Sequence, residues 1–416
     1  MRIGREYYLK RRKLLGGIGG TLGVLSGCIS WNERDFDDLE PLEEYWNQPR
    51  GRSDGSRYLG RSAPSGNVSE RWSRSVGEVV AGPVVYGETV VVAERTEVTA
   101  HELANGTERW TFDVSGTGTD IVGHVAVTDR SALVVTYASD GPATTDSRIS
   151  CFDVADGSML WEDDFDPVTY LRLGDAGGAY LVTRDDDVAV TCIDPRSGDT
   201  VWSTPSDGLL PDSWSGGDWT DVTLADFVVG REYCYLVGYD DETLVRRMNK
   251  RTGDIDGEID LPLDRVFECT VRDGNLIAAS DSHPEGKVTK SITCWSVDDG
   301  GGELLWTSAS DRGVGQFVTT PERAIYVPAT PDGGAKLTCV RLSTGETLWE
   351  RPVSEVPSLA AAGDRLYAVD GNEATGYAIE SGDRIWESTR ASGTDVVPAG
   401  EGLLTVESRG SLTRLS

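Results

Sequence analysis

The sequence predicts an all-β protein, an eight-bladed β-propeller built from four-stranded antiparallel blades. The first observation is a phrase with Gly four residues before Trp, which is clearest at Gly198/Trp202 and Gly345/Trp349. The second is its recurrence at intervals of about 40 residues, a period typical of radial repeat arrays. The third is that short apolar runs surround each copy, whereas helix-period patterning is absent.

Each copy of the phrase predicts a hairpin between the last two strands of a blade. Apolar runs lie on both sides of the turn, as at residues 188–193 and 200–202. The Gly is expected at a positive φ, which glycine alone adopts without a steric penalty. Two more short runs lie upstream of each hairpin, as at residues 83–86 and 89–93, and complete four strands per repeat.

Counting the residues that end the repeats, which are seven tryptophans and Gly257, gives eight blades over residues 68–416. One repeat keeps Gly253 but has Gly257 in the place of Trp, and another is two residues longer before its Trp. Residues 411–416 resemble a strand that precedes the turn, so the N-terminal strand is expected to close the last blade and leave no unpaired edge. A pair of β-sandwiches with coincidental Trp spacing is the alternative. The seven repeat-ending tryptophans are Trp72, Trp110, Trp161, Trp202, Trp306, Trp349 and Trp386.

This repeat resembles that of the PQQ-type (pyrroloquinoline quinone) β-propeller family, in particular its BamB-like lipoprotein subgroup of halophilic archaeal type. The similarity rests on the Gly turn with its terminal Trp and on the strand pair at residues 81–92, and more loosely on residues 46–54, which echo a Trp-Pro-x-Phe-Arg-Gly-Asp entry without its Phe. The resemblance implies that each Trp docks on the neighbouring blade and forms a girdle. It also implies two functional classes: quinoprotein dehydrogenases, which bind PQQ and calcium, and cofactor-free lipoproteins such as BamB-type assembly factors.

The N-terminal residues predict an export signal and a tether. Residues 1–27 combine a basic region, a short Gly-rich apolar stretch and small residues, which is typical of a signal peptide rather than a spanning helix. Arg11 and Arg12 favour the twin-arginine route, and Leu25-Ser-Gly-Cys28 resembles a lipobox with Cys28 as the lipidated residue. An uncleaved N-terminal helix is the alternative. Residues 28–67, acidic and then rich in Gly and Ser, are expected to form a tether that does not fold alone.

The charge of the chain restricts its partners. The formal net charge is −30, from 69 acidic and 39 basic residues. Such an excess argues against nucleic acid or an anionic membrane surface as the partner. It also resembles the composition of proteins from high-salt organisms, so we expect cooperative unfolding that depends on salt.

Most of the cysteines are expected to pack rather than to react. Cys151, Cys192, Cys294 and Cys339 occupy the same place in their repeats, which is too far apart for disulfide geometry, so they are interpreted as small core residues. For Cys234 and Cys269 both a disulfide and free thiols remain open. There is no Cys-x-x-Cys motif.

Residues for catalysis are not apparent in the sequence. The histidines, His101, His124 and His283, have neither a nucleophile nor metal-ligand spacing around them. Adjacent cysteines, which usually stack on the quinone in the quinoprotein dehydrogenases resembled here, are absent. We therefore name no catalytic, cofactor-binding or metal-binding residues and expect a non-enzymatic protein. A quinoprotein oxidoreductase with PQQ and calcium, or capture of a small solute or ion in the central channel, is the alternative.

One loop and the blade after it form the candidate partner contact. The loop carries Trp214 and Trp219, and the repeat that lacks its Trp carries the basic residues Arg246 and Arg247. Aromatic and Arg side chains are typical anchors of protein interfaces. Alternatively, Trp219 begins a strand and Trp214 folds back over a blade edge. The whole sequence predicts an exported monomer, anchored to the outer face of the cytoplasmic membrane, that binds envelope proteins or peptides.

Overall fold

The computed structural model describes residues 36–39, 46, 48–51, 54–60, 68–114, 121–138, 146–184, 188–205, 209, 223–239, 243–282, 289–297, 300–310, 314–328, 335–353, 357–369, 373–388, 393–407 and 409–416. Cys28, Arg11, Arg12, Trp214, Trp219 and His283 lie outside these residues. Within the described part, the helical structure is one 3-10 turn, η1 (Phe36–Asp38). A helix of the length and apolarity needed to cross a bilayer does not occur among these residues.

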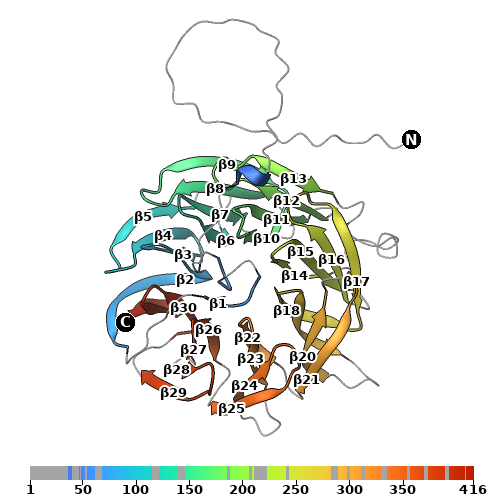
Figure 1. Ribbon diagram of the computed structural model, residues 1–416. Coiled ribbons are helices and arrows are strands. Elements are labelled where there is room, and N and C mark those ends of the chain that lie inside the picture. The colour runs from blue at the N-terminus through green and yellow to red at the C-terminus, as the bar shows by residue number, and fades with distance from the viewer. Residues whose placement is uncertain are drawn as a thin grey trace, which may run out of the picture.

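Eight four-stranded blades surround a common axis, as predicted (Figure 1). Alternating apolar runs produce the strands, and each run is paired antiparallel with the next. The strands of blades 1 to 4 are, in order, β2 (Glu70–Tyr86), β3 (Thr89–Glu94), β4 (Glu97–Glu102), β5 (Glu108–Asp113); β6 (Ile121–Val127), β7 (Ser131–Tyr137), β8 (Ser147–Asp153), β9 (Met159–Phe165); β10 (Val168–Leu173), β11 (Ala179–Arg184), β12 (Val188–Ile193), β13 (Thr200–Thr204); β14 (Thr223–Val229), β15 (Tyr233–Tyr239), β16 (Thr243–Asn249), β17 (Ile255–Leu261).

The second half of the ring repeats this order, with the first strand of each blade nearest the axis (Figure 1). The strands of blades 5 to 8 are, in order, β18 (Arg265–Arg272), β19 (Asn275–Ser282), β20 (Thr289–Ser296), β21 (Glu303–Ser310); β22 (Val314–Thr319), β23 (Arg323–Pro328), β24 (Ala335–Arg341), β25 (Thr347–Val353); β26 (Ser358–Ala362), β27 (Arg365–Val369), β28 (Ala374–Ala378), β29 (Arg384–Ser388); β30 (Asp395–Ala399), β31 (Gly402–Val406), β32 (Arg409–Leu415).

The ring is closed by a single long strand. The first half of β2 pairs with β32, from Glu70 opposite Leu415 to Glu78 opposite Arg409. The second half of β2 pairs with β3, so blades 8 and 1 belong to one seven-stranded sheet. This confirms that the N-terminal strand, which carries Trp72, supplies the fourth strand of the last blade.

The apolar core lies between adjacent blades rather than in one central mass. Val91 and Ala100 of blade 1, for example, pack in one cluster with Val125 and Val134 of blade 2. All six described cysteines are buried and free, including Cys234 and Cys269. The four that share a place in their repeats stand opposite the repeat-ending residues, at Cys151↔Trp161, Cys192↔Trp202, Cys294↔Trp306 and Cys339↔Trp349.

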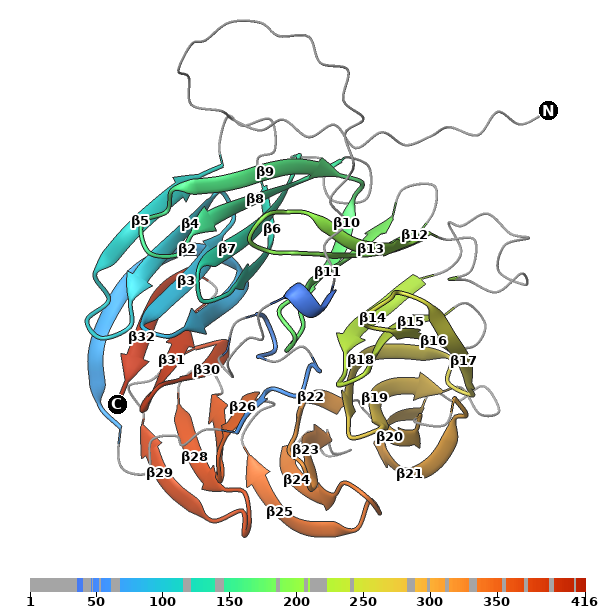
Figure 2. The same ribbon diagram turned by 45° about the horizontal axis from the view of Figure 1, so that its top comes forward.

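The boundary expected at residue 68 is wrong for part of the chain. The described residues among 46–59, which were predicted to belong to the tether, lie in the middle of the ring (Figures 1 and 2). Their last two described residues form β1 (Tyr58–Leu59), which pairs parallel with β26 and adds a fifth strand to blade 7. Composition predicted that this segment could not fold alone, but it folds against the surfaces that the blades provide. We call residues 46–59 the channel segment.

Candidate functional site

The repeat-ending tryptophans fasten each blade to the next. Six indole N–H groups donate to a backbone carbonyl at the hairpin turn of the following blade, at 2.6–3.0 Å. The seventh, Trp386, is buried, and its Nε1 has no acceptor among the described residues. The six pairs are Trp72–Leu103, Trp110–Val154, Trp161–Pro195, Trp202–Lys250, Trp306–Leu342 and Trp349–Ile379.

The turn glycines of the phrase have two physical reasons to be glycine. Gly382 adopts a φ of +69°, in the left-handed region that favours glycine. A Cβ placed on it would also lie 2.6 Å from the ring of Trp349 in the preceding blade. The turn therefore serves both the hairpin and the docking of the neighbouring indole.

In blade 4, Arg247 replaces the missing tryptophan. It stands opposite Gly257, the residue at the place of Trp, and its Nη1 donates to Val297 O of blade 5 at 2.8 Å. This carbonyl corresponds to the indole acceptors, because Val297 follows Cys294 by three residues as Val154 follows Cys151. The guanidinium lies 4.5 Å from the centre of the Tyr233 ring and forms an ion pair with Asp256.

These contacts correct the proposed partner patch. Arg247 is only 6% exposed and Arg246 only 9%. Arg246 donates to Leu209 O at 2.7 Å and pairs with Glu258, so both guanidiniums serve the fold. Exposure was expected from their clustered charge, but the missing indole leaves room that Arg247 fills from inside. Trp214 and Trp219, the other half of the patch, lie outside the described residues.

A second set of contacts surrounds the axis. In blades 2 to 5, the residue that follows a β-bulge in the innermost strand is polar: His124, Tyr170, Asp226 or Glu268. Several of these side chains bond to the backbone of the next innermost strand. Tyr170 Oη donates to Leu224 O at 3.2 Å, and Asp226 Oδ2 accepts from Cys269 N at 2.9 Å.

Blades 6 to 8 continue these axial contacts. Gln316 Oε1 accepts from Leu359 N at 3.0 Å. Ser358 Oγ donates to Asp395 Oδ1 at 2.8 Å. Polar side chains therefore connect the innermost strands, as the indoles connect the outer ones.

The channel segment brings two arginines into this polar layer. Arg50 Nη1 lies 2.6 Å from Asp226 Oδ2, and Arg50 Nε lies 3.2 Å from Glu268 Oε1. Arg57 Nε is 3.3 Å from the same oxygen of Glu268. On the other side, Arg172 Nη2 lies 3.4 Å from Asp226 Oδ1. We call Arg50, Arg57, Arg172, Asp226 and Glu268 the axial charge cluster.

The charges of Arg50 and Arg172 keep the Asp226 carboxylate of the cluster ionised. Burial alone would raise the pKa of Asp226, but Arg50 and Arg172 offset it, and the pKa lies below its usual value. Burial lowers the pKa of His124 to about 4, assisted by the nearby charge of Arg172, so this imidazole is neutral at pH 7. Arg50 has a φ of +71°, unusual for a residue with a Cβ. This backbone conformation lies in the turn that delivers its side chain to the two carboxylates.

Hydrogen bonds to the backbone of the innermost strands fix the channel segment at one end of the ring. Gln48 exchanges two hydrogen bonds with Leu173, the last residue of β10, at 3.0 and 2.9 Å. The segment also accepts from the ends of other innermost strands, so it contacts most of the ring. These pairs are Val85 N–Trp46 O, Val271 N–Asp54 O, Thr319 N–Ser56 O, Ala361 N–Arg57 O and Gly363 N–Leu59 O, at 2.5–3.2 Å.

The axial residues do not fit PQQ with calcium. Asp226 and Glu268 are the carboxylates best placed to bind a cation, but each is already neutralised by guanidiniums at 2.6–3.4 Å. The space beside them holds Arg50 and Arg57 of the chain itself. Among the described residues, no group of three His, Cys, Asp or Glu side chains is arranged for a metal ion. The sequence also lacks the adjacent cysteines implied for a stacked quinone.

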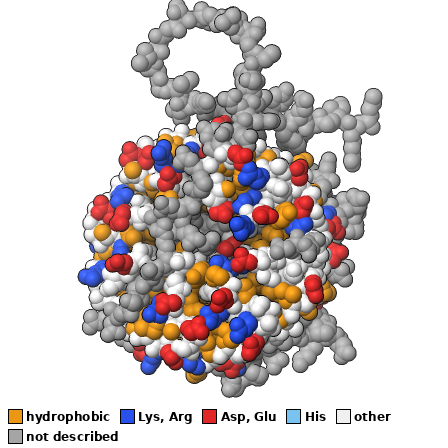
Figure 3. Space-filling model, in the orientation of Figure 1, with side chains coloured by type: hydrophobic (Ala, Val, Ile, Leu, Met, Phe, Trp, Pro, Cys, Tyr) orange, Lys and Arg blue, Asp and Glu red, His pale blue; other side chains and the backbone are white. Residues whose placement is uncertain are grey.

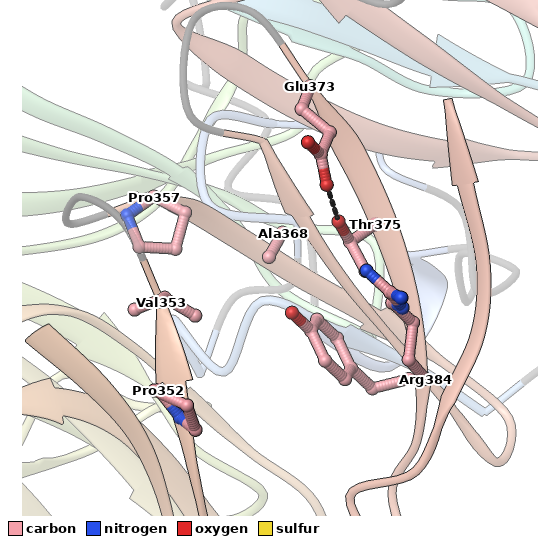
Figure 4. Close-up of a pocket in the computed structure, with 8 residues that line it drawn as sticks. Pro352, Val353, Pro357, Ala368, Glu373, Thr375 and Arg384 are labelled. Atoms are coloured by element: carbon pink, nitrogen blue, oxygen red, sulfur yellow. Dashed lines mark hydrogen bonds between the residues drawn. The ribbon is translucent and has the colours of Figure 1, made fainter. Parts of the chain in front are cut away.

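A cavity of about 140 Å³ lies between blades 6 and 7, away from the axis (Figure 4). Pro352 and Pro357 line one side, and Glu373 and Arg384 line the other. Glu373 accepts a hydrogen bond from Thr375 at 2.9 Å. Ligand pockets usually measure about 300–1,000 Å³, so this cavity is small for a cofactor.

The axial charge cluster was missed in the sequence. Asp226 was a usable signal, since it interrupts the apolar run of β14, and buried charges need a partner. Its partner Arg50 is 176 residues away, and spacing within the repeats does not point to it.

Known proteins with the same fold include BamB-type assembly factors and quinohemoprotein dehydrogenases. A family model described as outer membrane protein assembly factor BamB matches residues 145–257 and 291–415, more than half of the chain. BamB from Moraxella catarrhalis is 16% identical, with a TM-score of 0.54, over 84% of this chain and 97% of that one. The quinohemoprotein alcohol dehydrogenase ADHIIG from Pseudomonas putida HK5 is 13% identical, with a TM-score of 0.60, over 92% and 81%.

The computationally designed Ika8 protein gives a TM-score of 0.61 at 13% identity, over 83% of this chain and 98% of that one. At these identities the similar structures establish the fold alone. None of the curated proteins matches the chain. The match over most of the repeats, together with the blade geometry, shows that the chain belongs to the PQQ-repeat β-propeller family described by the outer membrane protein assembly factor BamB.

Proposed function

We propose that this protein is a non-enzymatic scaffold that binds envelope proteins or peptides at the cell surface. The observation that carries the proposal concerns the axis of the ring. There, the chain's own Arg50 and Arg57 neutralise the carboxylates of Asp226 and Glu268 and occupy the space beside them. Quinoprotein dehydrogenases share the fold, so the alternative is a PQQ- and calcium-dependent oxidoreductase. The channel segment contacts most of the innermost strands at one end of the ring, which supports the outer surfaces as the place where partners bind.

The proposed localisation follows from the N-terminal sequence. Arg11 and Arg12 would direct export by the twin-arginine route, and Cys28 would carry lipid and hold the protein at the outer face of the cytoplasmic membrane. The net charge of −30 supports a high-salt environment and a protein partner rather than nucleic acid. Because the strand edges at the ring seam are paired within the chain, they are not open to pairing with another chain, which supports a monomer.

Phe267 is the best candidate contact on the described surface. It is 41% exposed near the start of β18, and the guanidinium carbon of Arg265 and Nζ of Lys290 lie 4.9 and 5.3 Å from its ring centre. Figure 3 shows one face of the ring, where apolar side chains lie among interspersed acidic and basic ones. Aromatic and Arg side chains with apolar surroundings suit a protein partner.

A titration with PQQ and calcium in high salt tests the proposal against the enzymatic alternative. Trp fluorescence reports binding, and a dye-linked alcohol or sugar oxidation assay reports turnover, with a quinohemoprotein alcohol dehydrogenase as the positive control. We expect no saturable quenching and no oxidation. Saturable binding with turnover would overturn the proposal.

Co-purification from envelopes tests the contact itself. Phe267→Ala is expected to lower the recovery of partners, whereas Leu160→Ala, which removes an equally exposed apolar side chain from blade 2, is the matched control. Equal recovery with both variants would remove Phe267 from the contact.

A further inference from the structure

The chain is fastened to the ring before the channel segment begins. Phe36 and Leu39 are 6% and 8% exposed and belong to the apolar cluster between blades 3 and 4. The guanidinium carbon of Arg251 lies 5.3 Å from the centre of the Phe36 ring, and Arg251 forms an ion pair with Asp37. These contacts hold residues 36–39 at one point of the ring. We call them the docking turn.

The docking turn lies at one end of the ring. Its neighbour Gly178 is in the turn between β10 and β11, and Arg251 is in the turn between β16 and β17. In an antiparallel blade both turns are at the end where the innermost strand finishes, which is also where Gln48 contacts Leu173. We call this the turn end. The opposite end, where the innermost strands begin, is the start end.

The length of the chain before the docking turn limits its distance from a lipid anchor. Eight residue steps separate Cys28 from Phe36. Even a fully extended chain would span at most ~29 Å over these steps. Within the ring, the eight residues of β18 separate the start end from the turn end by about 23 Å, so an anchor beyond the start end would require nearly the whole extended length of these eight steps.

We propose that the turn end of blades 3 and 4 faces the lipid bilayer, and that the start end faces away from it. This inference rests on the lipid anchor at Cys28 proposed above. The docking turn brings the first described contact with the ring closer to Cys28, because without it the first described residue in contact with the ring is Trp46, eighteen steps from Cys28. The orientation presents Arg265, Phe267 and Lys290 to partners approaching from outside the membrane.

Energy transfer from the protein to the membrane surface tests this orientation. The acylated full chain, reconstituted in vesicles that contain an acceptor-labelled lipid, is labelled with a donor dye at Arg231→Cys or at Arg265→Cys. Arg231 is exposed between β14 and β15 at the turn end, and Arg265 is exposed at the start end. The six described native cysteines are buried and should not react. We expect transfer about twofold or more higher from position 231, because the two labels differ in height by roughly one strand.

Two further variants separate the possible failures. Cys28→Ser should abolish flotation with the vesicles, and a wild-type chain that does not float would overturn the anchor and the orientation together. A chain that floats but transfers equally from both labels, or more from position 265, would overturn the orientation alone. Phe36→Ala with Leu39→Ala releases the docking turn and should reduce the difference between the labels while the chain still floats. An undiminished difference would contradict the role of the docking turn.

Discussion

At the rim of the ring, six indole N–H groups reach across to the next blade, whereas at the axis arginines and carboxylates from distant parts of the chain meet. The rim contacts are apolar rings with one hydrogen bond each, such as Trp349 to Ile379 O at 2.9 Å. The axis contacts are buried charges, such as Arg50 with Asp226. One ring is therefore held together by two kinds of chemistry, and substitutions at the rim and at the axis should lower its stability in different ways.

Blade 4 combines a rim contact with the charged chemistry of the axis. Its rim contact is made by Arg247, with the charge chemistry of the axis, to a carbonyl that an indole reaches elsewhere. Because the acceptor Val297 O and the turn glycine Gly300 are retained, we expect the site to accept either an indole or a guanidinium as donor.

The largest loss is expected at the rim from Trp349→Ala. Removing a buried Trp leaves a cavity and costs roughly 3–5 kcal/mol of the free energy of unfolding. Denaturant unfolding in high salt measures the loss. A loss below about 1 kcal/mol, the size of a single hydrogen bond, would mean that the indole does not hold the blades together.

At the axis, Asp226→Asn should cost about 3 kcal/mol, because it leaves Arg50 and Arg172 without their shared charge. The loss should also depend on pH. The pKa of Asp226 is lower in the folded than in the unfolded chain, so its contribution is present above the unfolded value of about 3.9 and is lost as the pH falls below it. Stability curves of wild type and variant should therefore converge in acid. Asp364→Asn, in an exposed pair with Arg365, is the control and should change stability by less than about 0.5 kcal/mol.

The exception in blade 4 can be converted into an ordinary rim contact. Arg247→Cys removes the donor to Val297 O and should cost about 2 kcal/mol. Adding Gly257→Trp recreates the Cys and Trp pair of the other blades and should recover most of that loss. A double variant no more stable than Arg247→Cys would show that the site has adapted to the guanidinium. Unfolding of the single and double variants, combined in a cycle, measures the coupling.

The smallest effect distinguishes two tryptophans. Trp349→Phe keeps most of the apolar ring but loses its hydrogen bond, at a cost of about 1 kcal/mol from that bond. Trp386→Phe should cost less, because the Nε1 of Trp386 has no acceptor among the described residues. Equal losses from the two variants, measured by denaturant unfolding, would mean that the indole hydrogen bond contributes little.

The contrast between rim and axis also explains what could be predicted from the sequence. The blades, their number and the closing strand follow from local signals, since Gly and Trp recur at a fixed spacing within each repeat. The axial charge cluster depends on Arg50, which lies outside the repeats, and on carboxylates whose side chains meet only after the ring has formed. Arg247 was misinterpreted for a related reason. It is buried because Gly257 stands opposite it in place of Trp and leaves a space that the guanidinium fills.

The long strand β2 has a consequence for the order of events in the cell. Its first half pairs with β32, and Ser69 is bonded to Ser416 across 347 residues of chain. The ring therefore cannot close until β32 has been synthesised, and pairing over such a separation is intrinsically slow. A pathway that threads the chain through a membrane would begin transport before this closure, whereas one that carries finished proteins would wait for it. For the twin-arginine export proposed above, pairing of β2 with β32 would therefore be the step that must precede transport.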